Sequence, residues 1–198
     1  MPVKLPASDP LPAELATRHS NGLEQFFSSI KGGTGLSILD LAGANQANVT
    51  FITSLAHRLY SEDLLRSLPS ETEDTDRVQA FLRQNLAYPE RHFDGVLVWD
   101  VLEYLEAPLL TATVERLFRI VKPGACLLSV FHSADRTDSA PQRSFRIQDA
   151  KTLQLAPRPH RALVQTFNNR SLEKLFQRFE SLKFFLTRDN LREVIVKR

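Results

Sequence analysis

Five short runs of mostly apolar residues mark the hydrophobic pattern of this chain. Apolar runs of a few residues, bounded by polar or turn-forming positions, are typical of strands in the interior of an α/β sheet. The pattern predicts strands near residues 36–41, 94–99, 125–131, 182–186 and 191–196, the last two joined by a short polar turn.

Between these runs, apolar residues recur every three or four positions, which is the spacing of one helix face. Asn21 and Glu24 have the spacing of a capping box at the first such stretch. Lys122, Pro123 and Gly124 end the third, because proline and glycine interrupt helices. The helical stripes comprise Leu23, Phe26, Phe27 and Ile30; Phe51, Ile52, Leu55 and Ala56; Leu110, Val114, Leu117, Phe118 and Val121; and Leu172, Leu175, Phe176 and Phe179.

Other segments are less regular. Residues 57–61 fit a short strand, and residues 133–167 form a polar excursion that includes short strands. Residues 78–86 are ambiguous, because their apolar spacing fits a helix while their position is one where a further strand is expected. Residues 1–19 contain four prolines and are predicted to form an extended arm.

Strands that alternate with helices predict an α/β fold with a doubly wound, mostly parallel sheet and helices on both faces. The hairpin-linked pair at the end adds an antiparallel strand. We expect one domain over residues 20–198, following the arm.

Composition narrows the class of protein. The 198 residues are 42% hydrophobic and 24% charged, which excludes a disordered or collagen-like chain. A net charge of +2 does not indicate a nucleic-acid or membrane surface. Cys126 is the only cysteine and lies in a predicted core strand. The chain shows no signal-peptide core and no spanning apolar run of about 20 residues. We therefore expect a soluble, cytoplasmic protein.

The sequence SILDLAGANQANVT, residues 37–50, carries the candidate chemistry. It predicts a buried strand ending at Asp40, then a tight turn that contains Gly43, then a helix. Open α/β sheets bind nucleotide-like cofactors at such a strand–turn–helix unit.

Several other functions lack their motifs. The chain has no Walker loop, no metal-spaced Cys/His cluster and no Gly-x-Ser-x-Gly elbow. Without a Gly-x-Gly-x-x-Gly fingerprint, a nicotinamide dehydrogenase is a weak alternative. The sequence WDVL stands where enzymes that methylate the amino groups of nucleic-acid bases carry Asn/Asp-Pro-Pro-Tyr, which argues against base methylation.

The order of ILDLAG, FDGVLVWDVLEYL, LFRIVKPGACLLSVF and LREVIVKR resembles class I S-adenosylmethionine-dependent methyltransferases, most closely the type 11 methyltransferase domains. The resemblance covers about residues 20–198. Its most specific matches are Asp94, Asp100, Leu102, Glu103, Tyr104, Leu105, Lys122, Pro123 and Gly124. It implies a Rossmann-like, seven-stranded sheet with an antiparallel last strand, and a substrate-side insertion at residues 133–167.

The resemblance also implies a cofactor site for S-adenosylmethionine at the carboxyl ends of the first strands. Asn85 falls near the adenine-contacting position if residues 78–83 form a strand, and Glu62 or Asp63 falls where an acid binds the ribose hydroxyls. The implied cofactor-binding residues are Asp40, Ala42, Gly43, Ala44, Glu62, Asp63, Asn85, Trp99 and Asp100.

The turn departs from the family pattern. Ala42, Ala44 and Gln46 stand where the family commonly has glycine. Glycine at such positions permits positive φ or a close approach of the backbone to a ligand. Asn45 and Asn48 could compensate by donating amide hydrogen bonds at the start of the helix.

Structural roles compete with functional ones at several residues. Asp100 and Glu103 have capping-box spacing, and Asp63 could cap a helix instead of binding ribose. His132 could be a general base at the cleft edge or a surface residue. The basic residues near the end of the excursion could bind an anionic substrate or form a solvated face; they are Arg158, His160, Arg161 and Arg170.

Two functions remain. The first is methyl transfer from S-adenosylmethionine to a small-molecule acceptor, by an enzyme that needs no metal, nucleic acid or membrane. The second is a catalytically inactive methyltransferase fold that serves as a binding or regulatory module. The sequence assigns no catalytic residue, acceptor or oligomeric state.

Overall fold

The computed structural model describes residues 15–68, 75–132, 143–159 and 161–198. A six-stranded sheet with the order β3-β2-β4-β5-β9-β8 runs through this part of the chain. β3 (Arg58–Ser61), β2 (Ser37–Asp40), β4 (Phe93–Trp99) and β5 (Val121–His132) are parallel. β9 (Leu191–Lys197) runs antiparallel to β5 and to β8 (Ser181–Leu186). The five predicted strands and the antiparallel last strand are therefore confirmed.

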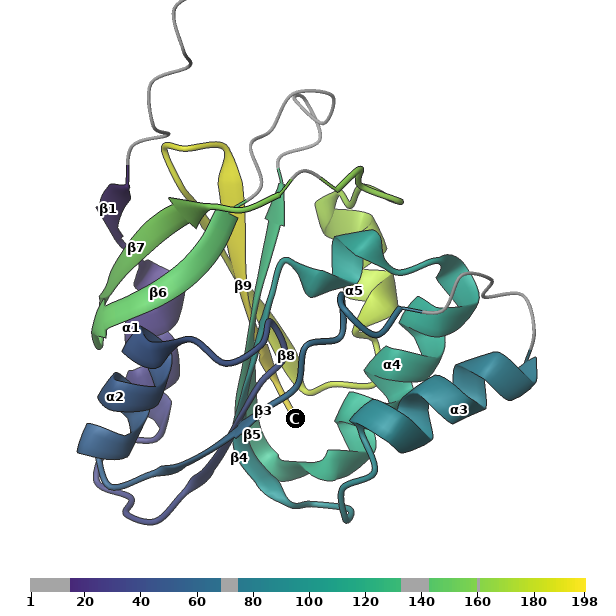
Figure 1. Cartoon of the computed structure of the whole chain (residues 1–198), viewed down its shortest axis with the longest axis horizontal. Coiled ribbons are helices and arrows are strands. Elements are labelled where there is room, and N and C mark those ends of the chain that lie inside the picture. The colour runs from purple at the N-terminus through teal and green to yellow at the C-terminus, as the bar shows by residue number, and fades with distance from the viewer. Residues whose placement is uncertain (1–14, 69–74, 133–142, 160) are drawn as a thin grey trace, which may run out of the picture.

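Helices cover both faces of this sheet, as Figure 1 shows. α1 (Asn21–Ser29) and α2 (Gln46–Ser54) lie on one face. α3 (Thr75–Asn85), α4 (Ala107–Ile120) and α5 (Asn169–Leu175) lie on the other. The α/β fold with two helical layers is confirmed. None of the helices in the described ranges combines the length and the apolarity needed to cross a membrane.

A second, three-stranded sheet lies on the same side as α1 and α2 (Figure 1). It pairs β1 (Ala16–His19), β7 (Thr152–Pro157) and β6 (Arg143–Asp149) in antiparallel order β1-β7-β6. β1 comes from the segment assigned to the arm, and β6 and β7 come from the predicted excursion. Phe145 and Leu153 join the hydrophobic core under α1 and α2. The rest of the predicted arm, residues 1–14, lies outside the described residues.

The predicted count of seven strands is wrong for the described part of the large sheet. Residues 78–85 belong to α3, so β3 is an edge strand with no further strand beside it in these ranges. Val78, Phe81 and Leu82 are buried together, because their spacing puts them on one face of a helix. The helical interpretation of this segment is therefore the correct one.

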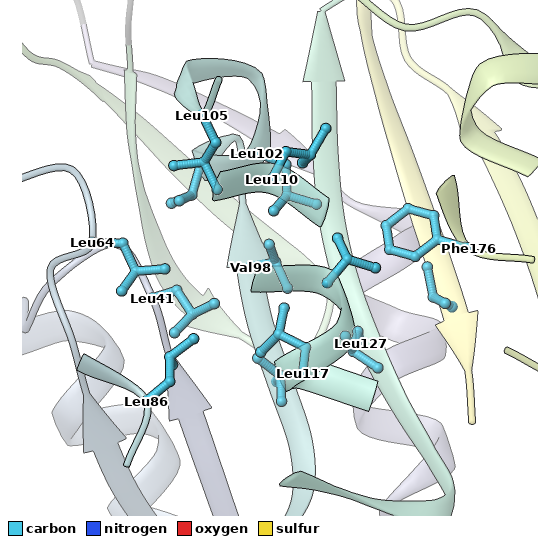
Figure 2. Packing of buried hydrophobic residues seen from close by; sticks show 14 of the residues in the cluster. Leu41, Leu64, Leu86, Val98, Leu102, Leu105, Leu110, Leu117, Leu127 and Phe176 are labelled. Carbon is cyan, nitrogen blue, oxygen red and sulfur yellow. The ribbon is translucent and has the colours of Figure 1, made fainter. Parts of the chain in front are cut away.

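The larger core lies between the sheet and α3, α4 and α5. Figure 2 shows Leu41, Leu64 and Leu86 lying together near the end of β2. All three side chains are fully buried. The chain that follows α3 is thereby packed close to the carboxyl end of β2.

A buried ion pair joins the first strand to the large sheet. Glu193 on β9 is fully buried, and its Oε1 lies 2.7 Å from Nη1 of Arg18 on β1. Its Oε2 accepts a 2.7 Å hydrogen bond from the backbone N–H of Gly22 at the start of α1. One carboxylate thus holds β1, α1 and β9 together.

We expect Arg18→Met to destabilise the protein by about 3 kcal/mol, because the substitution removes the positive charge that pairs with the buried Glu193 and leaves it the neutral N–H of Gly22. Urea unfolding followed by circular dichroism measures this change. Lys197→Met is the matched control, since it removes an exposed ion pair with Glu180. We expect the control to leave the unfolding midpoint nearly unchanged. Equal midpoints for Arg18→Met and the wild type would contradict the assigned role of the pair.

Candidate functional site

The carboxyl ends of β3, β2, β4 and β5 meet at one edge of the sheet, where open α/β sheets usually bind ligands. Asp40 is the last residue of β2, and Asp100 follows β4 directly. Glu62 follows β3, and His132 is the last residue of β5. The strand order therefore brings four titratable residues to the same edge.

The turn after β2 is joined to the residues that follow β3. The backbone N–H of Gly43 donates to the carbonyl of Glu62 over 3.0 Å, and Ala42 pairs with Asp63 in an isolated antiparallel bridge. Gly43 has φ +85°, in the region that favours glycine. Ala42 and Ala44 do not have positive φ. The alanines in this turn are therefore unstrained, and only Gly43 needs the conformational freedom of glycine.

The two acids after β3 have different surroundings. The partly buried Glu62 accepts a hydrogen bond at Oε1 from the hydroxyl of Tyr88. Burial and the nearby Glu62 carboxylate raise the pKa of Tyr88, so its hydroxyl remains a donor. Asp63 is exposed, and its Oδ1 accepts the backbone N–H of Arg66 over 3.0 Å. Asp63 thus caps a turn and its side chain lies beside Gly43, whereas the partly buried Glu62 carboxylate is bonded to Tyr88.

The Asp40 carboxylate is buried and accepts three hydrogen bonds. The donors are the backbone N–H of Ala42 at 3.1 Å, Nδ2 of Asn48 at 2.8 Å and Nε1 of Trp99 at 2.9 Å. Burial raises the pKa of Asp40, and these three donors oppose the increase. Asp40 therefore holds the turn, α2 and the end of β4 in one arrangement.

Trp99 is fully buried at the end of β4 in a strained backbone conformation. Its φ of +56° is rare for a residue with a side chain. The indole stacks on Phe145 of β6 with ring centroids 5.1 Å apart and an interplanar angle of 2°. The Ser129 hydroxyl donates to the Trp99 carbonyl over 2.9 Å. Strain of this kind persists where the surrounding contacts enforce it, often at functional sites.

The asparagine amides at the start of α2 bind protein groups. Asn45 accepts the Asn48 N–H at its Oδ1, which caps the helix, and donates to the Phe145 carbonyl. Asn48 donates to that same carbonyl and accepts the Ile147 N–H over 2.8 Å. These amides connect α2 to β6 instead of presenting donors to a ligand.

Asp100 and Arg158 form a buried ion pair at the end of β4. Nη2 of Arg158 lies 2.9 and 2.8 Å from the two oxygens of Asp100, and Tyr104 donates to Oδ2 over 3.3 Å. Burial raises the pKa of Asp100, although Arg158 opposes the shift. Asp100 makes no side-chain capping bond to the short helix η1 (Val101–Tyr104), so the capping-box interpretation is wrong.

Glu103 and His132 form a second buried pair. Nδ1 of His132 lies 2.6 Å from Oε2 of Glu103, and the His132 backbone N–H donates to both carboxylate oxygens. Burial alone would lower the pKa of His132, but Glu103 outweighs burial and the net direction is upward. Burial raises the pKa of Glu103 as well. His132 is therefore buried and paired, so the interpretation of His132 as a surface residue is wrong.

The condition for an adenine role of Asn85 is not met, because residues 78–83 are helical and do not form a strand. Asn85 lies at the end of α3, and its Nδ2 donates to the Phe81 carbonyl over 2.9 Å. Its Oδ1 accepts the Ser67 hydroxyl. The side chain is buried and serves to fix the end of the helix.

The structure thus brings together Asp40, Ala42, Gly43, Ala44, Glu62 and Asp63 at one turn, with Trp99 and Asp100 at the neighbouring strand end. Sequence reasoning did not single out Tyr88, and it left Arg158 as a solvated or substrate-binding residue. His160 lies outside the described residues. No group of three or more potential metal ligands occurs in the described ranges.

Comparison with known proteins gives the family. A profile of the methyltransferase domain family matches residues 26–180. A search of curated sequences finds no match.

Similar solved structures share the fold at low sequence identity. The 1,6-didemethyltoxoflavin-N1-methyltransferase of Burkholderia thailandensis, solved with 1,6-didemethyltoxoflavin and S-adenosylhomocysteine, is 14% identical with a TM-score of 0.52; the match covers 89% of this chain and 76% of that one. A SAM-dependent methyltransferase of Archaeoglobus fulgidus is 10% identical with a TM-score of 0.53, covering 89% and 91%. Phosphoethanolamine N-methyltransferase 2 of Haemonchus contortus, solved with phosphomonomethylethanolamine and S-adenosylhomocysteine, is 11% identical with a TM-score of 0.54, covering 90% and 52%.

We expect NMR titration of His132 to give a pKa above the ordinary 6.5, and Glu103→Gln to lower it. Because the pKa of His132 is higher in the folded state than in the unfolded state, its pairing with Glu103 stabilises the protein fully below pH 6.5. This stabilisation is lost as the pH rises through the folded-state pKa. The free energy of unfolding lost in Glu103→Gln should therefore be larger at about pH 6 than at about pH 9. His132→Gln assigns the signal by removing it. A wild-type pKa at or below 6.5 would contradict the pairing.

Proposed function

The chain belongs to the methyltransferase domain family, and we propose that it transfers a methyl group from S-adenosylmethionine to a small-molecule acceptor. Two of the similar structures hold S-adenosylhomocysteine together with a small acceptor, which supports both parts of the proposal. The residues that would bind the cofactor are those of the turn after β2 and the acid after β3.

One observation carries this proposal: the Gly43 turn is hydrogen-bonded to the backbone of Glu62. A bound cofactor would therefore meet turn backbone and a partly open carboxylate side by side. Glu62 offers two acceptor oxygens, which suits the two hydroxyls of a ribose. Gly43 supplies the positive φ that gives the turn its shape beside this acid.

The backbone of the turn supports the proposal despite its alanines. Positive φ is confined to Gly43, so Ala42 and Ala44 keep the turn in its observed shape without strain. Each alanine adds only one methyl group at the ligand-facing loop. Alanine in place of glycine therefore adds a methyl group between the turn and the ligand, but it does not change the shape of the backbone.

The proposed reaction depends mainly on positioning. S-adenosylmethionine supplies an electrophilic methyl group on a sulfonium when it is bound. The chain contributes the turn and Glu62, which would orient the cofactor, and a second surface that would hold the acceptor in line. Many acceptors need no further acid or base, so we assign no catalytic residue.

We place the acceptor beside the second sheet. Residues 133–167 follow β5, and their strands β6 and β7 belong to that sheet. Phe145 of β6 stacks on Trp99 at the end of β4. The insertion therefore reaches the same sheet edge as the cofactor residues, which supports its proposed substrate role.

A cytoplasmic location fits the cysteine content. Cys126 is the only cysteine of the chain, and it is buried and free. A single cysteine cannot form a disulfide within the chain, so the fold does not depend on an oxidising compartment. We therefore propose that the protein works in the cytoplasm.

A non-catalytic binding module is the second candidate, and the burial of the site favours it. Asp40, Trp99 and Asp100 are at most 1% exposed. Their side chains bind other protein groups, Trp99 donating to Asp40 and Asp100 accepting from Arg158. In this candidate, these contacts take the place that the family gives to a cofactor. Titration calorimetry with S-adenosylmethionine separates the two candidates, because only the first requires binding.

We expect wild-type protein to bind S-adenosylhomocysteine and Gly43→Val to weaken that binding about 100-fold or more. A Cβ at Gly43 would lie 3.2 Å from Oδ2 of Asp63, and valine disfavours φ +85°. The β-branched side chain would also push against the Asp63 side chain, so the turn would have to shift. Isothermal titration calorimetry gives both dissociation constants.

Gly32→Val is the matched control for backbone strain. Gly32 has φ +87° in the loop after α1, and a Cβ at this residue would have nothing within 4 Å. This loop precedes β2 and is at the opposite end of the strand from Gly43. We expect the control to retain wild-type affinity. Wild-type affinity in Gly43→Val as well would show that the turn is not the cofactor site.

A further inference from the structure

The free edge of β3 is packed by the chain that follows α3. In the described ranges no strand pairs with this edge. The ring of Tyr88 instead lies against Tyr60 of β3 and Phe93 of β4, with centroid distances of 5.8 and 4.8 Å. Both contacts are edge-on, at interplanar angles of 85° and 76°. The ring is therefore held from two strands.

The backbone of this segment is fixed as well. Arg116 of α4 donates from Nε to the Leu86 carbonyl over 2.9 Å and from Nη2 to the Tyr88 carbonyl over 2.6 Å. Leu86 is fully buried beside Leu41 and Leu64 (Figure 2). Tyr88 is thus anchored through its ring and its backbone, although it lies outside any helix or strand.

The Tyr88 hydroxyl donates to Oε1 of Glu62, the acid that follows β3. We propose that Tyr88 is a positioning residue for the ribose subsite: it holds one oxygen of Glu62 so that the carboxylate is oriented for the ribose hydroxyls of the cofactor. The inference rests on the proposed function, since it assumes that Glu62 binds S-adenosylmethionine or its product.

The physical reason is the freedom of a glutamate side chain. Glu62 is only partly buried, so its carboxylate would otherwise sample several rotamers that binding must restrict. A hydroxyl on an anchored ring removes much of that freedom before the ligand arrives. Each carboxylate oxygen can accept two hydrogen bonds, so Oε1 and Oε2 both remain acceptors for the two ribose hydroxyls. Tyr88, a loop residue, would thus orient Glu62 beside β3, whose outer edge pairs with no further strand in the described ranges.

Calorimetry with two probes tests this role. The probes are S-adenosylhomocysteine and its 2′,3′-dideoxy analogue, in which hydrogen replaces both ribose hydroxyls. We expect Tyr88→Phe to weaken binding of S-adenosylhomocysteine about tenfold, because it removes one hydrogen bond to a charged acceptor. The same substitution should change the affinity for the dideoxy analogue less than about twofold, because that probe makes no bond to Glu62.

Two further variants make the test specific. Tyr60→Phe removes a hydroxyl from the neighbouring ring and should keep wild-type affinity for both probes. Glu62→Gln should weaken binding of S-adenosylhomocysteine, and Tyr88→Phe should add little in that background, as expected of coupled residues. Melting temperatures check folding. If Tyr88→Phe does not fold, Glu62→Gln decides through its selectivity between the two probes.

The outcomes are distinct. Wild-type protein that does not bind S-adenosylhomocysteine overturns the inference together with the proposed function. Binding by the wild type that is unchanged in Tyr88→Phe overturns the inference alone. An equal loss of affinity for both probes also overturns it, because a merely structural role of the ring would affect them alike. Equal affinity of Glu62→Gln and wild type for S-adenosylhomocysteine does so too.

Discussion

The buried carboxylate of Asp40 connects the parts of the structure that form the candidate site. It accepts from the turn, from Asn48 of α2 and from Trp99 at the end of β4. Asn48 in turn accepts a hydrogen bond from the backbone N–H of Ile147 in β6. A buried carboxylate is tolerated only where such donors surround it. The large sheet, the turn and the second sheet therefore share one polar junction.

The positions of the strands could be predicted because interior strands are runs of apolar residues in the sequence. β4 and β5 read as apolar runs since neighbouring strands and helices cover them on every side. The turn after β2 and the acid after β3 could also be located, because each follows a strand whose position was already known. Glu62 and Gly43 lie side by side as a consequence of strand order alone.

The misplaced features depend on choices that periodicity does not resolve. The apolar spacing of residues 78–86 allowed a helix or a strand, and in the helix Asn85 bonds to Phe81 and Ser67. Arg158 reaches Asp100 from 58 positions away, and His132 reaches Glu103 from 29. No local pattern signals pairs of that separation. Tyr88 was missed for the same reason, since only the folded chain places it beside Glu62.

Trp99 also gives the protein a built-in optical reporter. It is the only tryptophan in the chain, so intrinsic emission excited at its absorption band comes from one place. That indole is shielded from water, donates to Asp40 and is stacked on Phe145. Its emission maximum and quenching by iodide consequently follow the junction between the turn and β6, without any label. Events elsewhere in the fold change this signal only if they reach that junction.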